Sequence, residues 1–465
     1  MNTSDKKMSI SVRSFVTAIV VIFVLMIAAY ILTLVIPGGS YARVDDGSGH
    51  MIVDVAGGFT FTEGGLPFWK WLLSPVLVLT ASGSGTLIAV IIFLLVIGGV
   101  FSALERCGLM RHMLDKMVRR FGAVRYRLMA IVVLFFMAMG AAIGSFEECV
   151  PLVPIVVALA LQLGWDAMTG VAMSLLAVGC GFASGVCNPF TVGVAQQLAG
   201  LPMFSGAWLR MISFVCIYGL LLLFIRFHAK HVEKPLTHTE TQTAAADPKA
   251  DRGLVLFCAI LGTGIAVILC SGFVPALQDY TMIIVAITFL LAGIVSSLAC
   301  GMSGRELGKT FLSGVGGICP AVLMILMASS IKYTLEEASV LDTILHGAVG
   351  MAETLPQWAV ILFIYLIVLV MNFFIPSGSA KAFMLMPLIV PMAQIFGISP
   401  QLCVVAFAFG DGFSNVLYPT NPALLISLGL ADVSYADWFR WSWKFHALNL
   451  LLTSGLLLFG LTVGY

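Results

Sequence analysis

Long apolar stretches recur along the whole chain. The first, residues 14–36, carries no charged side chain over 23 positions, and at about 1.5 Å per residue this length crosses a hydrocarbon core of roughly 30 Å. No small-residue cleavage site follows it, so we expect a retained membrane span and not a signal peptide. The pattern predicts an all-α polytopic membrane protein. Further apolar stretches lie at residues 85–104, 128–143, 150–163, 168–187, 206–226, 253–274, 281–300, 313–331, 357–375, 383–396, 402–417 and 445–464.

The composition agrees with this interpretation. Of the 465 residues, 60% are hydrophobic and only 10% are charged, whereas about a quarter of the residues of soluble domains are charged. The net charge of +1 gives no reason to expect a nucleic-acid partner. The ten cysteines show no metal-ligand spacing, so we interpret them as small packing residues. The expected partner is the lipid bilayer.

Positive residues set the expected orientation. Lys6, Lys7 and Arg13 precede the first span, and the bias of basic residues toward the inner side predicts a cytoplasmic N-terminus. The dense basic stretch 106–127 is expected on the same side as an amphipathic surface helix, and the polar stretch 226–253 as a linker.

The residues after the first span are expected on the outer side. Residues 37–69 are rich in glycine and fit an external loop, as a small β-hairpin or as coil. Residues 67–83 are interrupted by Pro75, so we expect an interfacial or re-entrant segment there.

The two halves of the chain resemble each other in short blocks. SGVCNPFT at 184–191 matches SNVLYPTN at 414–421, and AWLR at 207–210 matches DWFR at 437–440. The number of spans between the halves gives them opposite orientations, so we predict inverted-topology repeats, as in many secondary transporters. The expected division is an N-terminal span 1–37, an external loop and interfacial segment 38–83, repeat 1 at 84–226 with a re-entrant hairpin at 128–164, a cytoplasmic linker 227–252, connecting spans 253–312, and repeat 2 at 313–465 with a hairpin at 357–396.

Four polar interruptions fall within apolar sequence, two in each repeat. The hairpin tips are GSFEE at 144–148 and PSGSAK at 376–381, and the broken helices are interrupted at 181–191 and 410–421. Gly and Pro prevent a continuous helix, and freed backbone groups are tolerated at membrane depth only where protein or a wet cavity surrounds them. Freed carbonyls suit Na⁺ and helix N-termini suit substrate carboxylates. The alternative is that these residues merely kink packed helices.

Charged residues at these interruptions are candidates for function, because an ionisable group inside the membrane costs about 3 kcal/mol or more. Glu147 and Lys381 hold related places at the two tips, and Glu148 follows Glu147. They would suit a zwitterionic or cationic amino acid, or a proton that neutralises the carboxylate; with a dicarboxylate, Lys381 would be the partner. The competing interpretation is a structural ion pair, or a tip in solvent. Asp411 would ligate Na⁺, carry a proton or hydrogen bond a helix end.

With these motifs, the sequence resembles the YfcC branch of the DcuC/ArcD-like carriers of the ion transporter superfamily. The resemblance covers nearly the whole chain and rests on GSFEECVPLVPI, NPFTVGVAQ, IPSGSAKAFMLMPL and GFSNVLYPTNP. It implies a cation-coupled symporter or exchanger of elevator type, with a homodimeric scaffold, in a bacterial inner membrane. The implied cargo is a small carboxylate-bearing metabolite, either a four-carbon dicarboxylate or an amino acid such as a basic one.

The resemblance also implies which residues line the substrate and cation sites. Na⁺ would lie near Asn188 and Asn421, with H⁺ as the other coupling ion and no further cofactor expected. Relatives often have an Asn-Thr pair at these places, and the different spacing in this chain leaves Na⁺ coupling open. The implied residues are Ser145, Glu147, Asn188, Thr191, Ser377, Ser379, Asn415, Thr420 and Asn421, to which the charge argument adds Glu148, Lys381 and Asp411.

Two other classes of function are alternatives. Polar hairpins also line channels, whose flux would neither saturate nor run uphill with an ion gradient. The segment AFGDG at 408–412 nearly matches the GxGD motif of intramembrane aspartyl proteases, but Ala408 replaces the first glycine. HExxH and GxSxG are absent, so we expect no enzyme.

Overall fold

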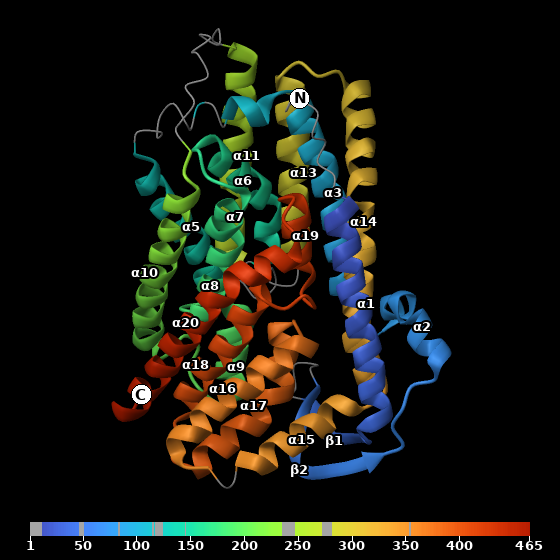
Figure 1. Cartoon of the computed structure of the whole chain (residues 1–465), viewed down its shortest axis with the longest axis vertical. Coiled ribbons are helices and arrows are strands. Elements are labelled where there is room, and N and C mark those ends of the chain that lie inside the picture. The colour runs from blue at the N-terminus through green and yellow to red at the C-terminus, as the bar shows by residue number, and fades with distance from the viewer. Residues whose placement is uncertain are drawn as a thin grey trace.

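The molecule is a bundle of long helices with one small sheet at its end (Figure 1). The computed structural model describes residues 12–45, 51–81, 84–113, 116, 124–144, 146–234, 247–271, 281–352 and 355–465. Within these residues, eight helices are long and apolar enough to cross a membrane. The chain is therefore a multi-pass membrane protein, as its sequence pattern predicts.

The first half of the chain contains the sheet and several short helices. Its elements are α1 (Val12–Val35), β1 (Gly38–Asp45), β2 (Met51–Thr62), α2 (Phe68–Leu77), α3 (Ser84–Arg106), α5 (Arg125–Ile143), α6 (Val153–Gln162), α7 (Ala167–Val171), α8 (Ala177–Ser184), α9 (Val194–Leu198) and α10 (Ala207–Val232). Short 3-10 helices lie at Val78–Thr80 and Glu147–Leu152, and π-helices at Ala172–Leu176 and Pro189–Gly193.

The described residues of the second half form helices and no strand. Its elements are α11 (Pro248–Ser271), α13 (Thr281–Ala299), α14 (Gly304–Glu337), α15 (Val340–Ala352), α16 (Gln357–Phe374), α17 (Gly378–Ile395), α18 (Pro400–Gly412), a 3-10 helix at Phe413–Val416, α19 (Pro422–Leu430) and α20 (Tyr435–Thr462).

One small sheet accompanies the helices. β1 and β2 pair antiparallel, with an irregular register between Tyr41 and Ala42. Tyr41 and Val53 bury their side chains, and this burial stabilises a hairpin that would be marginal alone in water. Of the two forms expected for residues 37–69, the structure has the β-hairpin, at the end of the molecule opposite the N-terminus (Figure 1).

Three expected domain boundaries fall inside continuous helices. The boundary at 226/227 lies within α10, the boundary at 252/253 within α11, and the boundary at 312/313 within α14. Hydrophobicity marks only the part of a helix in the lipid, whereas Lys, Arg and Glu are good helix formers and extend it beyond the apolar stretch. Residues 114–115 and 117–123 of the basic stretch and the linker residues 235–246 lie outside the described residues.

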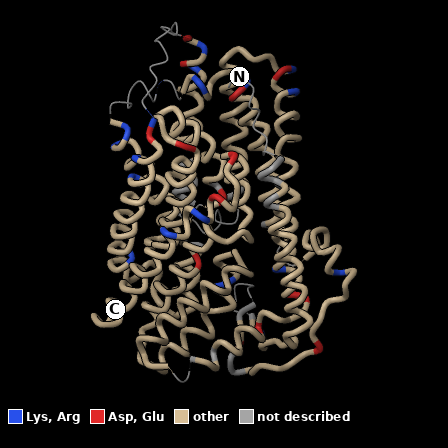
Figure 2. Tube along the Cα trace, in the orientation of Figure 1, with Lys and Arg blue, Asp and Glu red and all other residues tan. Residues whose placement is uncertain are grey.

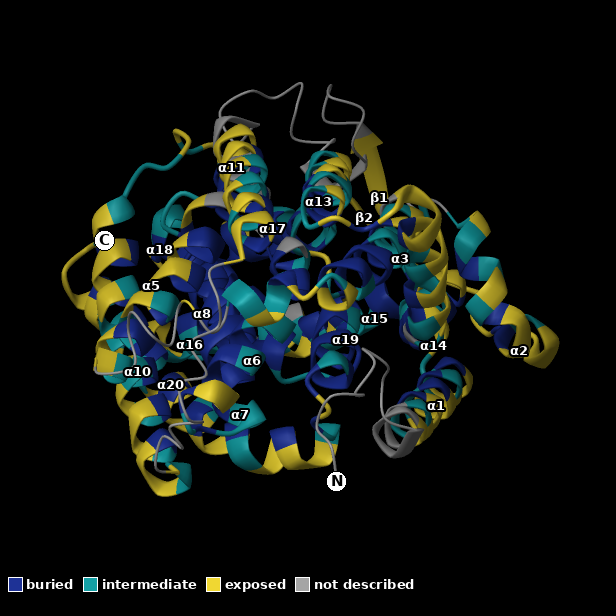
Figure 3. Cartoon of the chain, turned by 90° about the horizontal axis from the view of Figure 1, so that it is seen from above, coloured by how far each residue is buried: buried dark blue, intermediate teal, exposed yellow. Residues whose placement is uncertain are grey.

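The centre of the bundle is formed by α8, which is buried throughout, and by α18, which is buried from Leu402 to Gly412. These helices contact each other, while α5 packs on α8 and α16 packs on α18. Seen from above, buried residues occupy the middle and exposed residues face outward (Figure 3). Many of the exposed ones are apolar, such as Leu223 and Leu451, which is the pattern of a bundle surrounded by lipid.

The chain leaves regular α-helix at all four predicted interruptions. Gly144, in the left-handed conformation with φ +76°, ends α5, and Gly185 with φ +50° ends α8. The break after α16 extends from Ile375 to Ser377, and α18 passes through a 3-10 turn before Asn421 caps α19. Glycine tolerates positive φ without steric cost, which explains the ends at Gly144 and Gly185.

Candidate functional site

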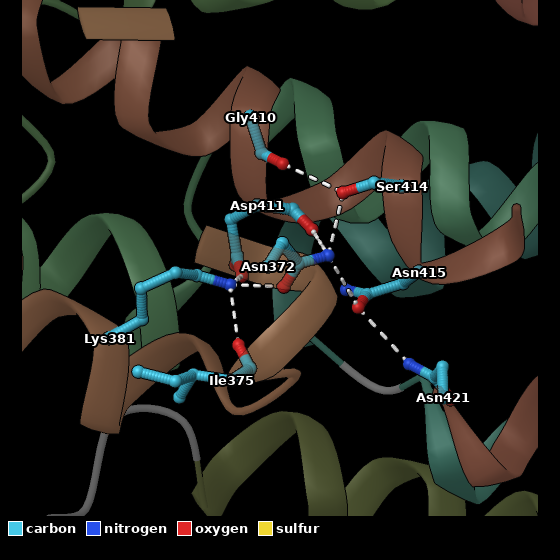
Figure 4. A network of polar contacts seen from close by, with 8 residues as sticks. All are labelled: Asn372, Ile375, Lys381, Gly410, Asp411, Ser414, Asn415 and Asn421. Atoms are coloured by element: carbon cyan, nitrogen blue, oxygen red, sulfur yellow. Dashed lines mark hydrogen bonds and ion pairs between the residues drawn. The ribbon is translucent and has the colours of Figure 1, made fainter. Parts of the chain in front are cut away.

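A buried polar network lies where α16, α17 and α18 meet (Figure 4). From the first turn of α17, the Lys381 Nζ atom donates to Asp411 Oδ1 on α18 at 2.5 Å and to the Ile375 carbonyl at 3.1 Å. It also donates to the Asn372 side-chain oxygen on α16. The side chains of Lys381 and Asp411 are both fully buried. Three oxygens from a carboxylate, an amide and a main-chain carbonyl therefore surround one ammonium.

Asn372 connects this ammonium to the helix break after α18. Its Nδ2 atom donates to the Asp411 carbonyl at 3.0 Å, to Ser414 Oγ at 2.6 Å and to Asn415 Oδ1 at 3.0 Å. Asn421 Nδ2 also donates to Asn415 Oδ1, at 3.1 Å. The network thus joins the end of α16 to both sides of the α18–α19 break, as the dashed lines in Figure 4 show.

The network also reaches the first half of the chain through the start of α17. A Cβ atom on Gly378 would lie 2.8 Å from Asp411 Oδ2 and 2.5 Å from Thr191 Cγ2, so only glycine allows this close approach. Asp411 Oδ2 and Thr191 Oγ1 are buried and have no hydrogen-bond partner among the described residues. Because an unsatisfied buried polar atom costs about 1–3 kcal/mol, these two oxygens are candidate contacts for a proton or a cargo group.

A second carboxylate, Glu147, approaches from the other half of the chain. It begins the 3-10 helix Glu147–Leu152 after the α5 end and is half-buried. Its charge interacts with that of Asp411. With all three groups ionised, Glu147, Asp411 and Lys381 together carry one more negative than positive charge.

Comparisons with known proteins identify the class of molecule that holds this network. A family model described as "DcuC: C4-dicarboxylate anaerobic carrier" matches residues 15–462. The chain belongs to this family. YfcC of Escherichia coli strain K12, named as a candidate basic amino acid antiporter, is 31% identical over 408 residues, which are 83% of this chain and 80% of YfcC. The molecule is thus a transporter and not an enzyme.

Other similar proteins cover the chain more fully at lower identity. An uncharacterized protein of Haemophilus influenzae is 24% identical over 98% of each chain. The solved YdaH transporter of Alcanivorax borkumensis is 17% identical, with a TM-score of 0.45 over 97% of this chain and 99% of that one. MtrF of Neisseria gonorrhoeae, described with a class of antimetabolite efflux pumps, is 16% identical, with a TM-score of 0.46 over 95% and 94%.

The network of this DcuC-family carrier contains several of the residues predicted from sequence. Thr191 lies close to Asp411 at Gly378, and the charge of Glu147 interacts with that of Asp411. Asn188 lies close to the predicted hairpin tip at 144–148. A Cβ atom on Gly144 would be 2.7 Å from Asn188 Cγ. The predicted residues joined by hydrogen bonds in the network are Lys381, Asp411, Asn415 and Asn421.

Other predicted residues lie apart from the network or outside the described residues. Ser377 is exposed and Ser379 is partly exposed. The Ser377 carbonyl accepts from the Lys381 backbone N–H at 3.1 Å. Thr420 is buried next to Asn421, with its hydroxyl oxygen unpaired among the described residues. Ser145 and the side chain of Glu148 lie outside the described residues.

Sequence reasoning missed the residue at the centre of the network, Asn372. An available signal was its amide in QWAVILFIYLIVLVMNFF, because strongly polar groups are rare in the interior of apolar spans. Sequence reasoning also related Lys381 to Glu147, whereas the structure pairs Lys381 with Asp411. That partner could not be identified from the tips alone, because it comes from the break after α18.

Proposed function

We propose that this carrier is a secondary active transporter that exchanges amino acids with cationic side chains across a bacterial inner membrane. The observation that carries the proposal is the group of oxygens around Lys381 Nζ, supplied by Asp411, Asn372 and the Ile375 carbonyl. A cargo ammonium has the same charge and the same need for acceptors, so it would compete with Lys381 for them. The name of the relative YfcC supports the same class of cargo.

The balance of charge also favours a cationic cargo. Glu147 and Asp411 exceed Lys381 by one negative charge when all are ionised, and charges act strongly on one another where water is excluded. A cargo cation would neutralise this excess. The α-carboxylate of the cargo has two possible partners. One is Lys381, once its ammonium leaves Asp411, and the other is the group of backbone amides at the N-terminus of α17.

We infer that the coupling ion is a proton. Lys381 occupies Oδ1 of Asp411, and its positive charge opposes the binding of a Na⁺ ion at the same carboxylate. At the two places expected for Na⁺, Asn188 Oδ1 accepts from the Thr191 N–H at 3.3 Å, and Asn421 Oδ1 accepts from the Ala423 N–H at 2.9 Å. A proton taken up by Glu147 and passed to Asp411 would weaken the hold of Asp411 on Lys381 and release the ammonium. Proton binding and cargo binding would then be linked through one ion pair.

A four-carbon dicarboxylate is the second candidate cargo. The family description names this class, and Lys381 is a suitable partner for one carboxylate. A dicarboxylate would have to approach Glu147 and Asp411 as well, which requires that protons neutralise them. The two cargo classes therefore predict opposite responses to acidification on the cargo side: faster binding of a dicarboxylate and weaker binding of a cation.

The architecture that we propose for this cycle is an elevator built from two inverted repeats. The support is the meeting of helix breaks from both halves near Asp411, as expected when hairpin tips and broken helices share one site. We further propose a homodimer, as the resemblance implies, with the N-terminus in the cytoplasm. Lys and Arg are frequent at the end of the molecule that holds the N-terminus (Figure 2), in agreement with the positive-inside rule.

Proteoliposomes test the proposed function. Vesicles preloaded with unlabelled arginine should take up labelled lysine or arginine with saturation, and an imposed pH gradient should change the rate more than a Na⁺ gradient. Vesicles preloaded with succinate serve as the comparison. Exchange of succinate without exchange of arginine would show that the cargo is a dicarboxylate. A flux that does not saturate would show that the protein is a channel.

A further inference from the structure

A cleft lies beside α17, at the end of the molecule that holds the sheet. Its volume is about 780 Å³, within the range of sites for small molecules, roughly 300–1,000 Å³. We call it the sheet cleft, because β1 and β2 form one wall together with the end of α14, the start of α15 and the first turns of α17. Its lining residues are Gly39, Ser40, Arg43, Val53, Thr80, Ala81, Lys332, Tyr333, Glu336, Glu337, Ser339, Leu341, Asp342, Ala380, Phe383 and Met384.

Paired charges of both signs line the sheet cleft. On α14, Lys332 Nζ lies 3.2 Å from Glu336 Oε1, and both side chains are partly exposed. Glu337 pairs with Lys70 of α2 at 3.1 Å, where both side chains are again partly exposed. Exposed pairs of this kind contribute about 0–1 kcal/mol, so the charged groups of a ligand can replace them at little cost.

A deeper ion pair holds the wall of the sheet cleft in place. Asp342 of α15 is buried and accepts from Arg43 at 3.0 Å and from the Tyr41 N–H at 3.1 Å. Tyr41 Oη also lies 2.8 Å from His346 Nδ1, and the Phe59 ring stacks on the His346 ring at 4.1 Å. These contacts fix the sheet on α15 and keep the cleft in shape.

One helix separates the sheet cleft from the buried network. Ala380, Phe383 and Met384 face the cleft, at the i, i+3 and i+4 spacing of one helix face. Lys381, on the same first turns of α17, turns its fully buried side chain to Asp411. A ligand in the cleft would therefore touch the same helix that presents Lys381.

We propose that the sheet cleft is an initial binding site, which holds a cationic amino acid before it reaches Lys381. The inference rests on the proposed function, since the cargo class is the same. Glu336 and Glu337 supply acceptors for the side-chain cation, and Lys332 supplies a donor for the α-carboxylate. The aliphatic stem packs on Phe383 and Met384, so the cleft matches both the charges and the apolar part of the ligand.

Transport kinetics of the variant Glu336→Gln/Glu337→Gln test this proposal. In proteoliposomes, KM for arginine added on the sheet side should rise about fivefold, as the loss of exposed charge contacts allows, while kcat stays near that of the parent. Because exposed charges are screened by salt, the difference should shrink at high ionic strength. Glu63→Gln is the matched control, as Glu63 is an exposed carboxylate outside the cleft, and its KM should not change.

Thiol labelling provides a readout that does not need transport. Ala380→Cys should react with a membrane-impermeant maleimide added on the sheet side, and arginine should slow the reaction relative to glutamate at equal ionic strength. The parental chain, which has ten cysteines, gives the background. An unchanged KM together with labelling that arginine does not slow would overturn the proposal that the sheet cleft is an initial binding site. A parental chain that binds arginine in the cleft but does not transport it would overturn the proposed function instead.

Discussion

Lys381 and Asp411 neutralise each other where both side chains are fully buried, so removal of one partner leaves an unpaired buried charge. We predict that Lys381→Gln and Asp411→Asn each lower the free energy of unfolding by about 3–5 kcal/mol. The double variant should recover much of this loss, because neither charge remains. Thermal unfolding of the purified protein in detergent, arranged as a double-mutant cycle, measures the coupling.

The same variants separate structure from transport. The double variant Lys381→Gln/Asp411→Asn is expected to fold but to transport nothing, since both the ammonium and the carboxylate are gone. Arginine exchange at the parental rate in this variant would show that the ion pair takes no part in transport, whatever the pair contributes to stability.

Asn372 holds three acceptors and the Lys381 ammonium in one arrangement. We predict that Asn372→Leu lowers the free energy of unfolding by about 1–3 kcal/mol, because it leaves buried partners unsatisfied, and that it reduces arginine exchange strongly. Tyr365→Phe is a matched control on α16, where Tyr365 shares a hydrogen bond of 3.0 Å with Thr453. The control should lose about 1 kcal/mol and keep its transport rate; equal transport loss in both variants would contradict a special role for Asn372.

Glu147 tests the proton coupling. We expect Glu147→Gln to exchange arginine between compartments of equal pH, but to lose the change in rate that a pH gradient produces, because a neutral amide cannot take up a proton. Glu105→Gln serves as the control, as Glu105 is an exposed carboxylate near the end of α3. A full response of the Glu147→Gln rate to the pH gradient would place the coupling proton elsewhere.

At the scale of elements, local chemistry made some features predictable and long-range packing hid others. The breaks at Gly144 and Gly185 follow from glycine itself, so the sequence predicts them. The expected domain boundaries at 226/227 and 312/313 fall inside α10 and α14, because polar helix formers continue a helix outside the apolar stretch. The partner of Lys381 lies 30 residues away at Asp411, and only the packing of α17 on α18 brings the two together.

The start of α7 shows how one cap depends on pH. Asp166 accepts from the Thr169 N–H at 2.9 Å and pairs with His228 at 3.0 Å. Burial alone would raise the pKa of the Asp166 carboxyl, but the hydrogen bonds from His228 and Thr169 outweigh it and lower the pKa below its usual value. A lowered pKa in the folded state gives stability that is present above the unfolded pKa, about 3.9, and is lost as pH falls through the folded pKa.

We therefore predict that Asp166→Ala costs about 1 kcal/mol at pH 7, as for other lost N-caps. Asp166→Asn should cost less, since its amide oxygen can still cap the helix. Unfolding measured from pH 7 downward should show the parent approaching Asp166→Asn as pH falls below about 4. A stability difference between parent and Asp166→Asn that stays constant over this range would show that the carboxylate charge contributes nothing.

The network is a property of the whole molecule, because both halves supply it. Glu147 and Thr191 come from the first half, whereas Asn372, Lys381 and Asp411 come from the second. Neither half alone has both the ion pair and the second carboxylate. A relative movement of the halves would therefore change the surroundings of Asp411, which is how cargo exchange and a change of access can be linked in one site.

The orientation of the whole chain gives the last prediction. The end of α10 and the start of α11 lie at one end of the molecule and the sheet lies at the other (Figure 1), so long apolar helices separate them. A protease site inserted between β1 and β2 should be cut only from outside the cell. A site inserted at residues 235–246 should be cut only in inverted vesicles, because the positive-inside rule predicts a cytoplasmic location for that end. Cleavage of both sites from the same side would mean that the helices between them do not cross the membrane as the bundle requires.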